Sequence, residues 1–294
     1  MMLIDGVFSG GGIKGYALIG AYQILEEKGY RFKRTAGTSA GSIIAAFIMA
    51  GYTGKEIEKM MLELNTEILL DERLGVRIPF AKWLLLYWKM GLFKGDNLES
   101  WLGEKLAAKG IHNFSHLPEG SFRVVASDVT HGEIVILPDD LSKYNCNPAT
   151  FSVAKAIRMS CSIPYFFEPV KMKCNTETTY IVDGGVLSNL PMWLFDNENA
   201  QKVRPVLGLK LTGKKYGIQP REIKNAISMF GALFETMKDA HDNRYISRKQ
   251  EKNIIFIPIE NTSSIDFYLS EKKKLELIEV GRNTTKKFLK QWSF

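Results

Sequence analysis

A serine between two glycines is the first group in this sequence that could do covalent chemistry. Gly37 to Gly41 reads GTSAG and fits the G-x-S-x-G pattern of a nucleophile elbow, with Ser39 at its centre. In such an elbow a sharp turn from strand to helix exposes the serine hydroxyl at the helix N-terminus, where free amides and the helix dipole favour developing negative charge. The pattern alone is weak evidence, because any glycine-rich turn between a strand and a helix can match it.

A glycine-rich loop near the N-terminus offers a site for an anion. Gly10 to Gly15 reads GGGIKG, and glycines let backbone amides converge on one point. The loop lacks the G-x-x-x-x-G-K-[ST] pattern of a P-loop, although it satisfies G-x-G-x-x-G. A dinucleotide-binding fold also needs an acidic residue at the end of the second strand, and Arg31 to Thr38 contains none. An oxyanion hole is therefore the better use for these amides.

The third motif is Asp183 followed by Gly184 and Gly185, at the end of an expected strand. In open α/β sheets, active residues collect at the carboxyl ends of the strands, where Ser39 and the glycine loop are also expected. Asp-Gly-Gly is equally a common turn sequence, so taken alone this aspartate could simply form a turn.

The elements that must position these motifs alternate between strand and helix patterns. Leu3 to Phe8 and Arg31 to Ala36 are expected strands, and each leads through a glycine turn into a helix. Two such units in succession predict βαβ construction and a central, mostly parallel sheet flanked by helices. Further strands are expected at Phe122 to Ser127, Glu133 to Leu137, Thr178 to Val182, Val206 to Leu211 and Ile254 to Ile257. Further helices are expected at Ser42 to Ala50, Lys55 to Leu64, Asp96 to Lys109, Thr150 to Met159, Arg221 to Gln250 and Glu271 to Lys290.

One α/β domain over residues 1–294 is expected, because no repeat, low-complexity tract or linker divides the chain. Residues 71–95 are expected to form an insertion, and residues 204–290 to supply the C-terminal strands and helices. Asp96 is expected to cap the helix that it opens. Ser162 to Val170 (SIPYFFEPV) is expected to be a connection bounded by prolines.

Taken together and in this order, the three motifs resemble those of the patatin-like phospholipase family. GGGIKG is similar to its glycine-rich oxyanion motif, GTSAG to its nucleophile elbow and DGG to its catalytic aspartate motif. SCSIPYFFEPV before the aspartate and SNLP after it agree as well. The resemblance covers about Leu3 to Leu194, and beyond it we recognise no motif. Lys14 stands where many members have arginine; both are cationic, but lysine lacks the bidentate fork.

The resemblance implies a lipid acyl hydrolase, a phospholipase A-type esterase with a Ser39–Asp183 dyad and no catalytic histidine. Asp183 would accept the Ser39 proton, and partial burial should raise its pKa enough to make it a useful base. The implied oxyanion hole consists of Gly10, Gly11, Gly12 and Ile13. The implied substrates are phospholipids, with neutral glycerolipids or a thioester open to the same dyad. No cofactor or metal is implied, and no H-E-x-x-H or calcium-loop spacing is present.

The histidines bear on a rival Ser–Asp–His triad. His112 and His116 lie in an expected loop before the aspartate motif, and His131 in a hairpin turn. Only His241 follows both the serine and the aspartate, as the α/β-hydrolase order requires, and its surroundings (DAHDNRY) indicate the charged face of a helix. A different class of function, a glycine-loop protein that holds an anionic ligand or nucleotide without turnover, stays open.

Composition limits the partners. With 45% hydrophobic and 24% charged residues the chain is typical of a soluble globular protein. The net charge of +7 favours anionic partners, and without an RNA-binding or zinc-finger signature no nucleic acid is expected. Three cysteines without C-x-x-C spacing, and no signal peptide, indicate a cytoplasmic protein. Peripheral association with a membrane surface is expected from the implied lipid substrate. Nothing in the sequence indicates an oligomeric state.

Phe80 to Phe93 (FAKWLLLYWKMGLF) has two interpretations. It could be a core helix, or it could be an interfacial segment too short to span a bilayer. In the second case Trp83, Tyr87 and Trp88 suit the headgroup boundary, and Lys82 and Lys89 face phosphates. The basic C-terminal run is expected to be a solvated helix face.

Overall fold

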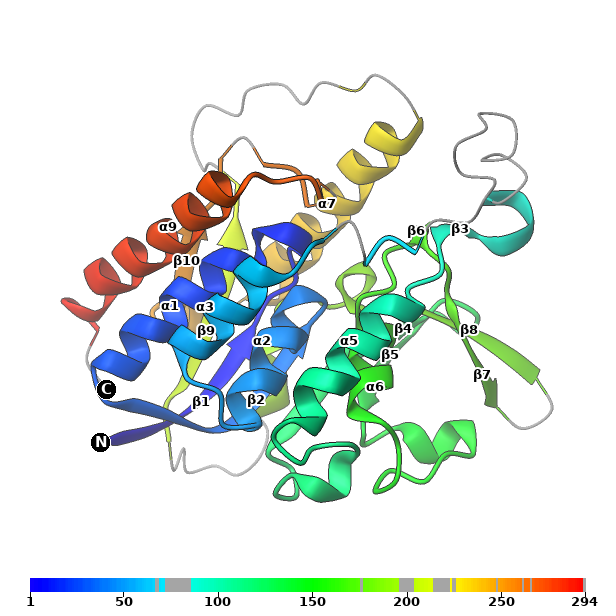
Figure 1. Cartoon of the computed structure of the whole chain (residues 1–294), viewed down its shortest axis with the longest axis horizontal. Coiled ribbons are helices and arrows are strands. Elements are labelled where there is room, and N and C mark those ends of the chain that lie inside the picture. Colours follow the sequence, from blue (N-terminus) through cyan, green and yellow to red (C-terminus); the bar gives the residue numbers. More distant parts are fainter. Residues whose placement is uncertain are drawn as a thin grey trace.

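The computed structural model has a central sheet flanked by helices (Figure 1). It describes residues 1–66, 69–71, 86–174, 177–195, 204–213, 223, 226–246, 248–260, 262–264 and 266–292. In this part of the chain the sheet has the strand order β10–β9–β1–β2–β4–β8–β7, and β5 also pairs with β4. The strands are β1 (Met2–Phe8), β2 (Tyr30–Thr38), β4 (Phe122–Asp128), β5 (Glu133–Leu137), β7 (Val170–Cys174), β8 (Glu177–Asp183), β9 (Val206–Thr212) and β10 (Ile254–Pro258).

The sheet is parallel from β10 to β4 and antiparallel beyond. Parallel ladders join β10 to β9, β9 to β1, β1 to β2 and β2 to β4. The strands β5 and β8 both run antiparallel to β4, and β7 runs antiparallel to β8. The expectation of a mostly parallel sheet between helices is confirmed, and so is the α/β class.

Alternation of side chains along each strand divides the core between the two faces of the sheet. Phe8 and Val124 point into the large core under the helices, whereas Val7 and Val125, their neighbours in the chain, point into a smaller cluster on the other face. That smaller cluster is covered by the segment from Leu190 to Phe195. The loop after Asp183 is thereby held against the back of the sheet.

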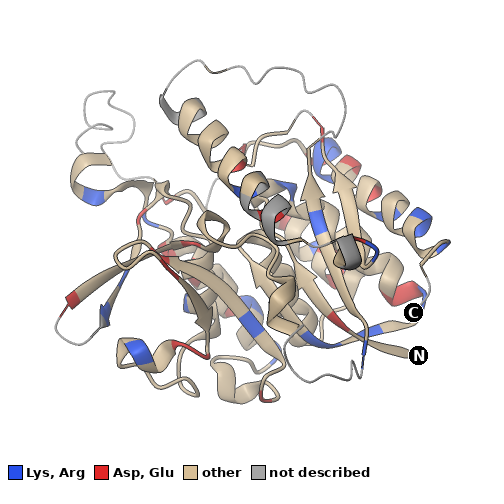
Figure 2. Ribbon diagram, turned by 180° about the vertical axis from the view of Figure 1, so that it is seen from behind, with Lys and Arg blue, Asp and Glu red and all other residues tan. Residues whose placement is uncertain are grey.

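The described helices are α1 (Tyr16–Glu27), α2 (Ala40–Met49), α3 (Gly54–Glu63), α5 (Asp96–Ala107), α6 (Val153–Ser160), α7 (Ala226–Tyr245), α8 (Arg248–Glu251) and α9 (Glu271–Leu289). The C-terminal helix α9 is more than a solvated face, because it packs along α1 with its backbone touching. A Cβ atom on Gly281 would lie only 1.9 Å from the carbonyl oxygen of Ala17. Leu277 and Ile278 are buried in this contact. Basic and acidic residues are interspersed along this helix (Figure 2).

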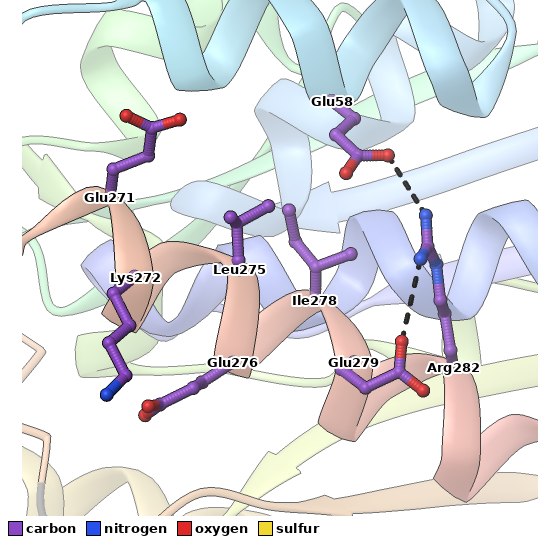
Figure 3. A pocket seen from close by; sticks show the side chains of 8 residues that line it. All are labelled: Glu58, Glu271, Lys272, Leu275, Glu276, Ile278, Glu279 and Arg282. Atoms are coloured by element: carbon purple, nitrogen blue, oxygen red, sulfur yellow. Dashed lines mark hydrogen bonds and ion pairs between the residues drawn. The ribbon is translucent and has the colours of Figure 1, made fainter.

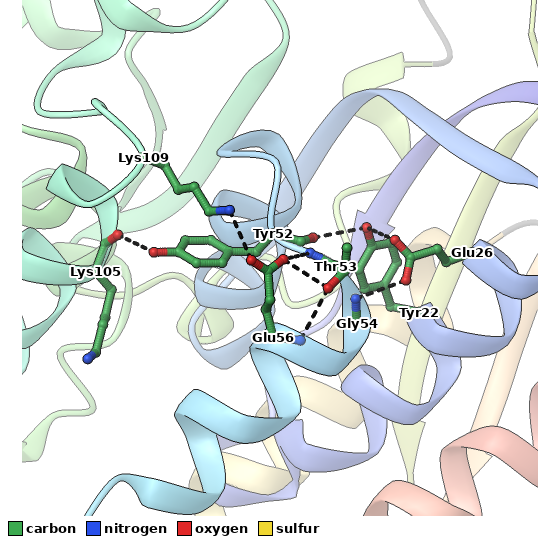
Figure 4. Close-up of polar contacts among 8 residues, drawn as sticks. All are labelled: Tyr22, Glu26, Tyr52, Thr53, Gly54, Glu56, Lys105 and Lys109. Atoms are coloured by element: carbon green, nitrogen blue, oxygen red, sulfur yellow. Dashed lines mark hydrogen bonds and ion pairs between the residues drawn. The ribbon is translucent and has the colours of Figure 1, made fainter.

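The start of α3 is fixed by a capping box. The Thr53 side chain accepts a hydrogen bond from the Glu56 amide, and Glu56 accepts one from the Thr53 amide at 2.7 Å (Figure 4). Lys109, on the turn after α5, pairs with Glu56 at 3.1 Å and lies over the Tyr52 ring. The Thr53 amide and hydroxyl and the Lys109 ammonium lower the pKa of Glu56 to about 2. The cap therefore also ties α3 to α5.

Two local expectations were wrong, both because distant residues decide the structure. Asp96 does not cap α5: Gly95 occupies the N-cap, and the Asp71 carboxylate accepts from the amides of Gly95 and Asp96, each at 2.7 Å. The segment expected to be a connection contains β6 (Tyr165–Phe167), which pairs in parallel with β3 (Gly91–Phe93). Neither partner could be seen from a local pattern.

Most of the expected insertion lies outside the described residues, including Lys82 and Trp83. Its described part contains β3 and, before it, a helical turn at residues 86–89, where the rings of Tyr87 and Trp88 meet edge to face and are 78% and 71% exposed. In the described segments no helix is long and apolar enough to cross a membrane.

Candidate active site

Ser39 sits on a strained turn between β2 and α2. Its backbone has φ 51° and ψ −130°, a left-handed conformation that non-glycine residues rarely adopt. The turn is held by the Ser39 amide, which donates to Ser160 Oγ at 2.8 Å, while the Ser160 hydroxyl donates to the Val125 carbonyl at 2.5 Å. Strain that the surroundings maintain in this way is typical of a nucleophile elbow.

The two glycines of the elbow are required by close packing. A Cβ on Gly37 would lie 2.6 Å from the Gly41 carbonyl carbon, and a Cβ on Gly41 would lie 2.3 Å from the Phe8 carbonyl oxygen. Any side chain at either position would push α2 away from β1 and β2. The G-x-S-x-G pattern is thus a consequence of how tightly this helix starts on the sheet.

Asp183 ends β8, 1% exposed, beside the serine. Its Oδ1 accepts a hydrogen bond from the Gly185 amide at 2.8 Å. Its Oδ2 is buried and, among the described residues, accepts no hydrogen bond of standard geometry. Burial raises the pKa of the Asp183 carboxyl to about 6, although the Ser39 hydroxyl, the Gly185 amide and the Lys238 charge each favour the ionised form. The carboxylate is therefore a stronger base than an exposed aspartate and has a free oxygen.

The glycine loop lies against the nucleophile. A Cβ on Gly10 would be 3.1 Å from Ser39 Cβ. Gly12, which begins the 3₁₀ turn Gly12–Gly15, has φ 55°. Any Cβ there would lie 2.0 Å from the Ser264 carbonyl oxygen, so only glycine fits.

The amides of this loop are not equivalent. The Gly10 amide donates to the Asn189 carbonyl at 3.3 Å, and the Ile13 amide donates to the Ser264 carbonyl at 3.1 Å. Within the described part of the chain the amides of Gly11 and Gly12 meet no acceptor. Of the four residues expected from the sequence, these two have donors available to an oxyanion.

An apolar cavity of about 70 Å³ begins at Ser39. It reaches between α2, α3 and β6, and Gly12 and Ile13 form its wall beside the serine. The other lining side chains are almost all apolar, among them Ile43, Met61, Leu64, Leu98, Ile163, Phe167 and Phe267. A narrow apolar space that opens on a nucleophile fits a hydrocarbon chain better than a polar ligand.

A larger hollow of about 590 Å³ lies elsewhere, between α3 and α9 (Figure 3). Its lining includes Glu58, Glu279 and Arg282, joined by ion pairs, and the apolar side chains of Leu275 and Ile278. It contains neither a nucleophile nor any of the motif residues. We therefore place the chemistry at the smaller cavity.

A buried polar chain supports the glycine loop from behind. Asn189 Nδ2 donates to Asp242 Oδ2 at 3.1 Å, and the same carboxylate pairs with Lys210 at 3.0 Å, with both charged side chains buried. Because the amide nitrogen faces the carboxylate, Asn189 Oδ1 points the other way, toward Gly10, and accepts no hydrogen bond from the described residues. These polar contacts link β9 (Lys210) through α7 (Asp242) and Asn189 to Gly10 in the glycine loop.

Several residues at the site were missed by sequence reasoning. Cys161 lines the cavity and hydrogen-bonds with Ser39, and burial raises the pKa of its thiol. Ser160, which holds the elbow, lies in the quoted SCSIPYFFEPV segment but had no role assigned. Lys238 and Asp242 lie on α7, where no motif signals a contact with the site; only the structure could reveal them.

Lys14 and the histidines lie as follows. Lys14 Nζ pairs with Glu235 Oε1 at 3.2 Å. Burial alone would raise the pKa of Glu235, but Lys238, Lys14 and Ser264 lower it to about 2. His131 pairs with Asp128 at 2.9 Å, away from Ser39, and His112 and His116 contact each other. His241 belongs to α7, and its side chain is outside the described set.

Comparison with known proteins gives a family match that spans all three motifs. Residues 6–196 match the family model for patatin-like phospholipase. YqhO of Bacillus subtilis, an uncharacterized protein, is 55% identical over 294 residues, with 100% of both chains covered. A probable lipid hydrolase of Invertebrate iridescent virus 6 is 27% identical over 189 residues, 63% of this chain and 61% of the viral one.

Among solved structures, VipD from Legionella pneumophila has a similar fold. The TM-score is 0.60 with 18% sequence identity, over 98% of this chain and 67% of VipD. At that identity the similarity concerns the fold alone.

Proposed function

The chain belongs to the patatin-like phospholipase family, and we propose that it hydrolyses fatty acyl esters of lipids, with Ser39 as nucleophile and Asp183 as general base. One observation carries the proposal. A strained elbow serine meets a buried carboxylate whose pKa is raised to about 6, and the Ser39 hydroxyl favours the ionised form of that carboxylate. An ordinary strand–helix turn would have no base beside its serine, and an aspartate that only forms a turn would be exposed to solvent.

In the proposed reaction Ser39 Oγ attacks the ester carbonyl carbon while its proton passes to Asp183 Oδ2. The amides of Gly11 and Gly12 stabilise the tetrahedral oxyanion, an interaction in which each donor is typically worth about 100–1000-fold in rate. Collapse expels the alcohol, which takes the proton back from Asp183. Water then attacks the acyl-enzyme, with Asp183 as base again, and releases the fatty acid and free Ser39.

The apolar cavity supports a lipid acyl group as substrate. An acyl chain bound there would replace water against Ile43, Leu98 and Phe167, which line it. Each buried methylene contributes about 0.8 kcal/mol. The cavity of about 70 Å³ is smaller than a long acyl chain, so binding requires the lining side chains to separate.

We also propose that the protein contacts a lipid surface. Tyr87 and Trp88 expose aromatic rings of the kind that suit the headgroup boundary. They belong to the segment from Phe80 to Phe93, for which a core helix and an interfacial element are the two interpretations. Their exposure favours the interfacial interpretation for this end of it.

The competing function is a binding protein that holds an anion at the glycine loop without turnover. A fluorophosphonate probe separates the two, because it reacts only with an activated serine. We expect stoichiometric labelling of the protein on Ser39, mapped by peptide mass spectrometry, and none in the Ser39→Ala variant. Labelling of another serine, or no labelling of the folded protein, would contradict the proposal. Hydrolysis of a phospholipid with two different acyl chains then identifies the ester that is cleaved.

A further inference from the structure

A lysine from outside the family motifs reaches the loop of the general base. Lys238 lies on α7, beyond residue 196, where the family match ends. Its side chain is 5% exposed and packs with its ammonium 5.4 Å from the centre of the Phe234 ring. Among the described residues it makes no hydrogen bond and no ion pair within 4.0 Å.

The stem of this lysine packs close to Gly185, the second glycine after the aspartate. A Cβ on Gly185 would lie 3.0 Å from Asp183 Oδ1 and 3.3 Å from Lys238 Cδ. The same point is 3.4 Å from Asn189 Oδ1. The Lys238 stem, Asp183 Oδ1 and Asn189 Oδ1 therefore all lie close to Gly185.

The other lysines near the site form ion pairs, whereas Lys238, whose charge lowers the pKa of Glu235, makes no ion pair within 4.0 Å among the described residues. Lys14 pairs with Glu235 at 3.2 Å, and Lys210 pairs with Asp242 at 3.0 Å. A buried cation without a counter-ion in contact is costly, and proteins normally pair it or use it to bind an anion. Asp183 is not an adequate counter-ion, because it must accept a proton in every turnover.

We propose that the Lys238 ammonium binds the phosphodiester of a glycerophospholipid while the ester carbonyl lies at Ser39. This inference rests on the proposed function and selects among its substrates, since neutral glycerolipids have no group for the lysine. In a glycerophospholipid the three-carbon backbone holds the phosphate only a few bonds from the scissile ester. A cation beside the general base is therefore within reach of it. A phosphate also supplies the negative charge that Asp183 loses when it is protonated.

The test compares two lipids with the same acyl chains, dioleoylphosphatidylcholine and dioleoylglycerol, in the same detergent micelles. Lys238→Met keeps the length and apolar packing of the side chain but removes the charge. Rates are measured on the alkaline plateau, so that any change in the pKa of Asp183 does not enter. We expect KM for the phospholipid to rise about 10–100-fold, as for loss of a charge-assisted hydrogen bond, with kcat nearly unchanged. The diacylglycerol should change less than about threefold, and Lys238→Arg should restore most of the difference.

Two controls separate the alternatives. Lys272→Met removes an exposed lysine that borders the distant hollow and reports any general effect of charge on micelle binding. Inorganic phosphate should inhibit the parent enzyme competitively and the Lys238→Met variant at least tenfold more weakly, since a free phosphate can enter the same site.

The outcomes decide the matter. An equal loss on both lipids, in a variant with parental thermal stability, would show that Lys238 does not act through the phosphate and would overturn the proposal. Inhibition by phosphate without any effect of Lys238→Met on the phospholipid KM would also overturn it, because the site would then hold free phosphate and not a headgroup. A parent enzyme that cleaves neither lipid would refute the proposed function itself, and the Lys238 site with it.

Discussion

Ser39 and Asp183 meet because the strands that carry them run toward each other along one edge of β4. Thr38, the last residue of β2, pairs with Val125, and Asp183, the last residue of β8, pairs with Ala126. Since β5 occupies the other edge of β4, the two strands end head to head. The change from parallel to antiparallel pairing within one strand thus creates the proposed dyad.

The pH dependence of the reaction should report the buried carboxyl. Burial raises the pKa of Asp183 to about 6, and the base must be ionised to accept the Ser39 proton. We expect kcat/KM to be flat above pH 7 and to fall about tenfold per pH unit below pH 6. A profile on a soluble ester that stays flat down to pH 5 would show that another group is the base.

Because Asp183 is buried, ionisation of its carboxyl above pH 6 should destabilise the folded protein. Its pKa in the folded state is raised from 3.8 to about 6, so the folded protein binds this proton more tightly than the unfolded chain does. The favourable contribution is complete below pH 4 and is lost as the pH rises to 6. We expect Asp183→Asn to stabilise the protein at pH 8 by up to about 3 kcal/mol and to have little effect at pH 4. Urea unfolding at the two pH values measures the difference; an equal effect at both would contradict the linkage.

The buried pair behind the glycine loop should matter for folding and for activity. Asp242→Asn leaves Lys210 buried without its counter-ion, and we expect a loss of about 3–5 kcal/mol in the free energy of unfolding. Replacing both residues, as Lys210→Met with Asp242→Leu, should recover much of the stability, because no unpaired charge remains.

The double variant should still react slowly with a fluorophosphonate, because Asn189 loses the partner that orients it beside Gly10. Parental labelling rates in the double variant would show that the pair serves stability alone.

Lipid-surface contact can be tested at the exposed aromatic pair. Tyr87→Ser with Trp88→Ser should lower activity on phospholipid vesicles about tenfold or more, because two interfacial aromatic rings are lost. Activity on a soluble short-chain ester should stay within about twofold, since both side chains are exposed in the folded protein. An equal loss on both substrates would instead indicate a structural role for this turn.

The sequence predicted the sheet well, and it placed Ser39 and Asp183 correctly at the ends of strands, because both features are encoded locally. The apolar strand patterns indicate which segments form the sheet, and the glycines of the elbow and the loop mark where strands turn into helices. The features it did not predict depend on residues far apart in the chain. Asp71 caps a helix that begins 25 positions later, and β6 exists only through pairing with β3. Lys238 and Asp242 lie on an amphipathic helix whose pattern does not reveal which of its charges are buried.

The oxyanion loop shows the same limit on a smaller scale. Gly10 and Ile13 belong to the motif, yet their amides are taken by Asn189 and Ser264, which lie far away in the sequence. The motif thus indicates where the hole lies, but only the folded chain shows which donors are free.

The most direct test of the Ser39–Asp183 dyad is kcat/KM for Asp183→Asn and His241→Ala on one soluble ester, with folding checked by circular dichroism. We expect kcat/KM to fall about 100–10,000-fold for Asp183→Asn, the usual worth of a general base, and to stay at the parental value for His241→Ala. In a Ser–Asp–His triad both changes are severe, because histidine takes the proton and aspartate orients it. A large loss in a folded His241→Ala variant would contradict the dyad.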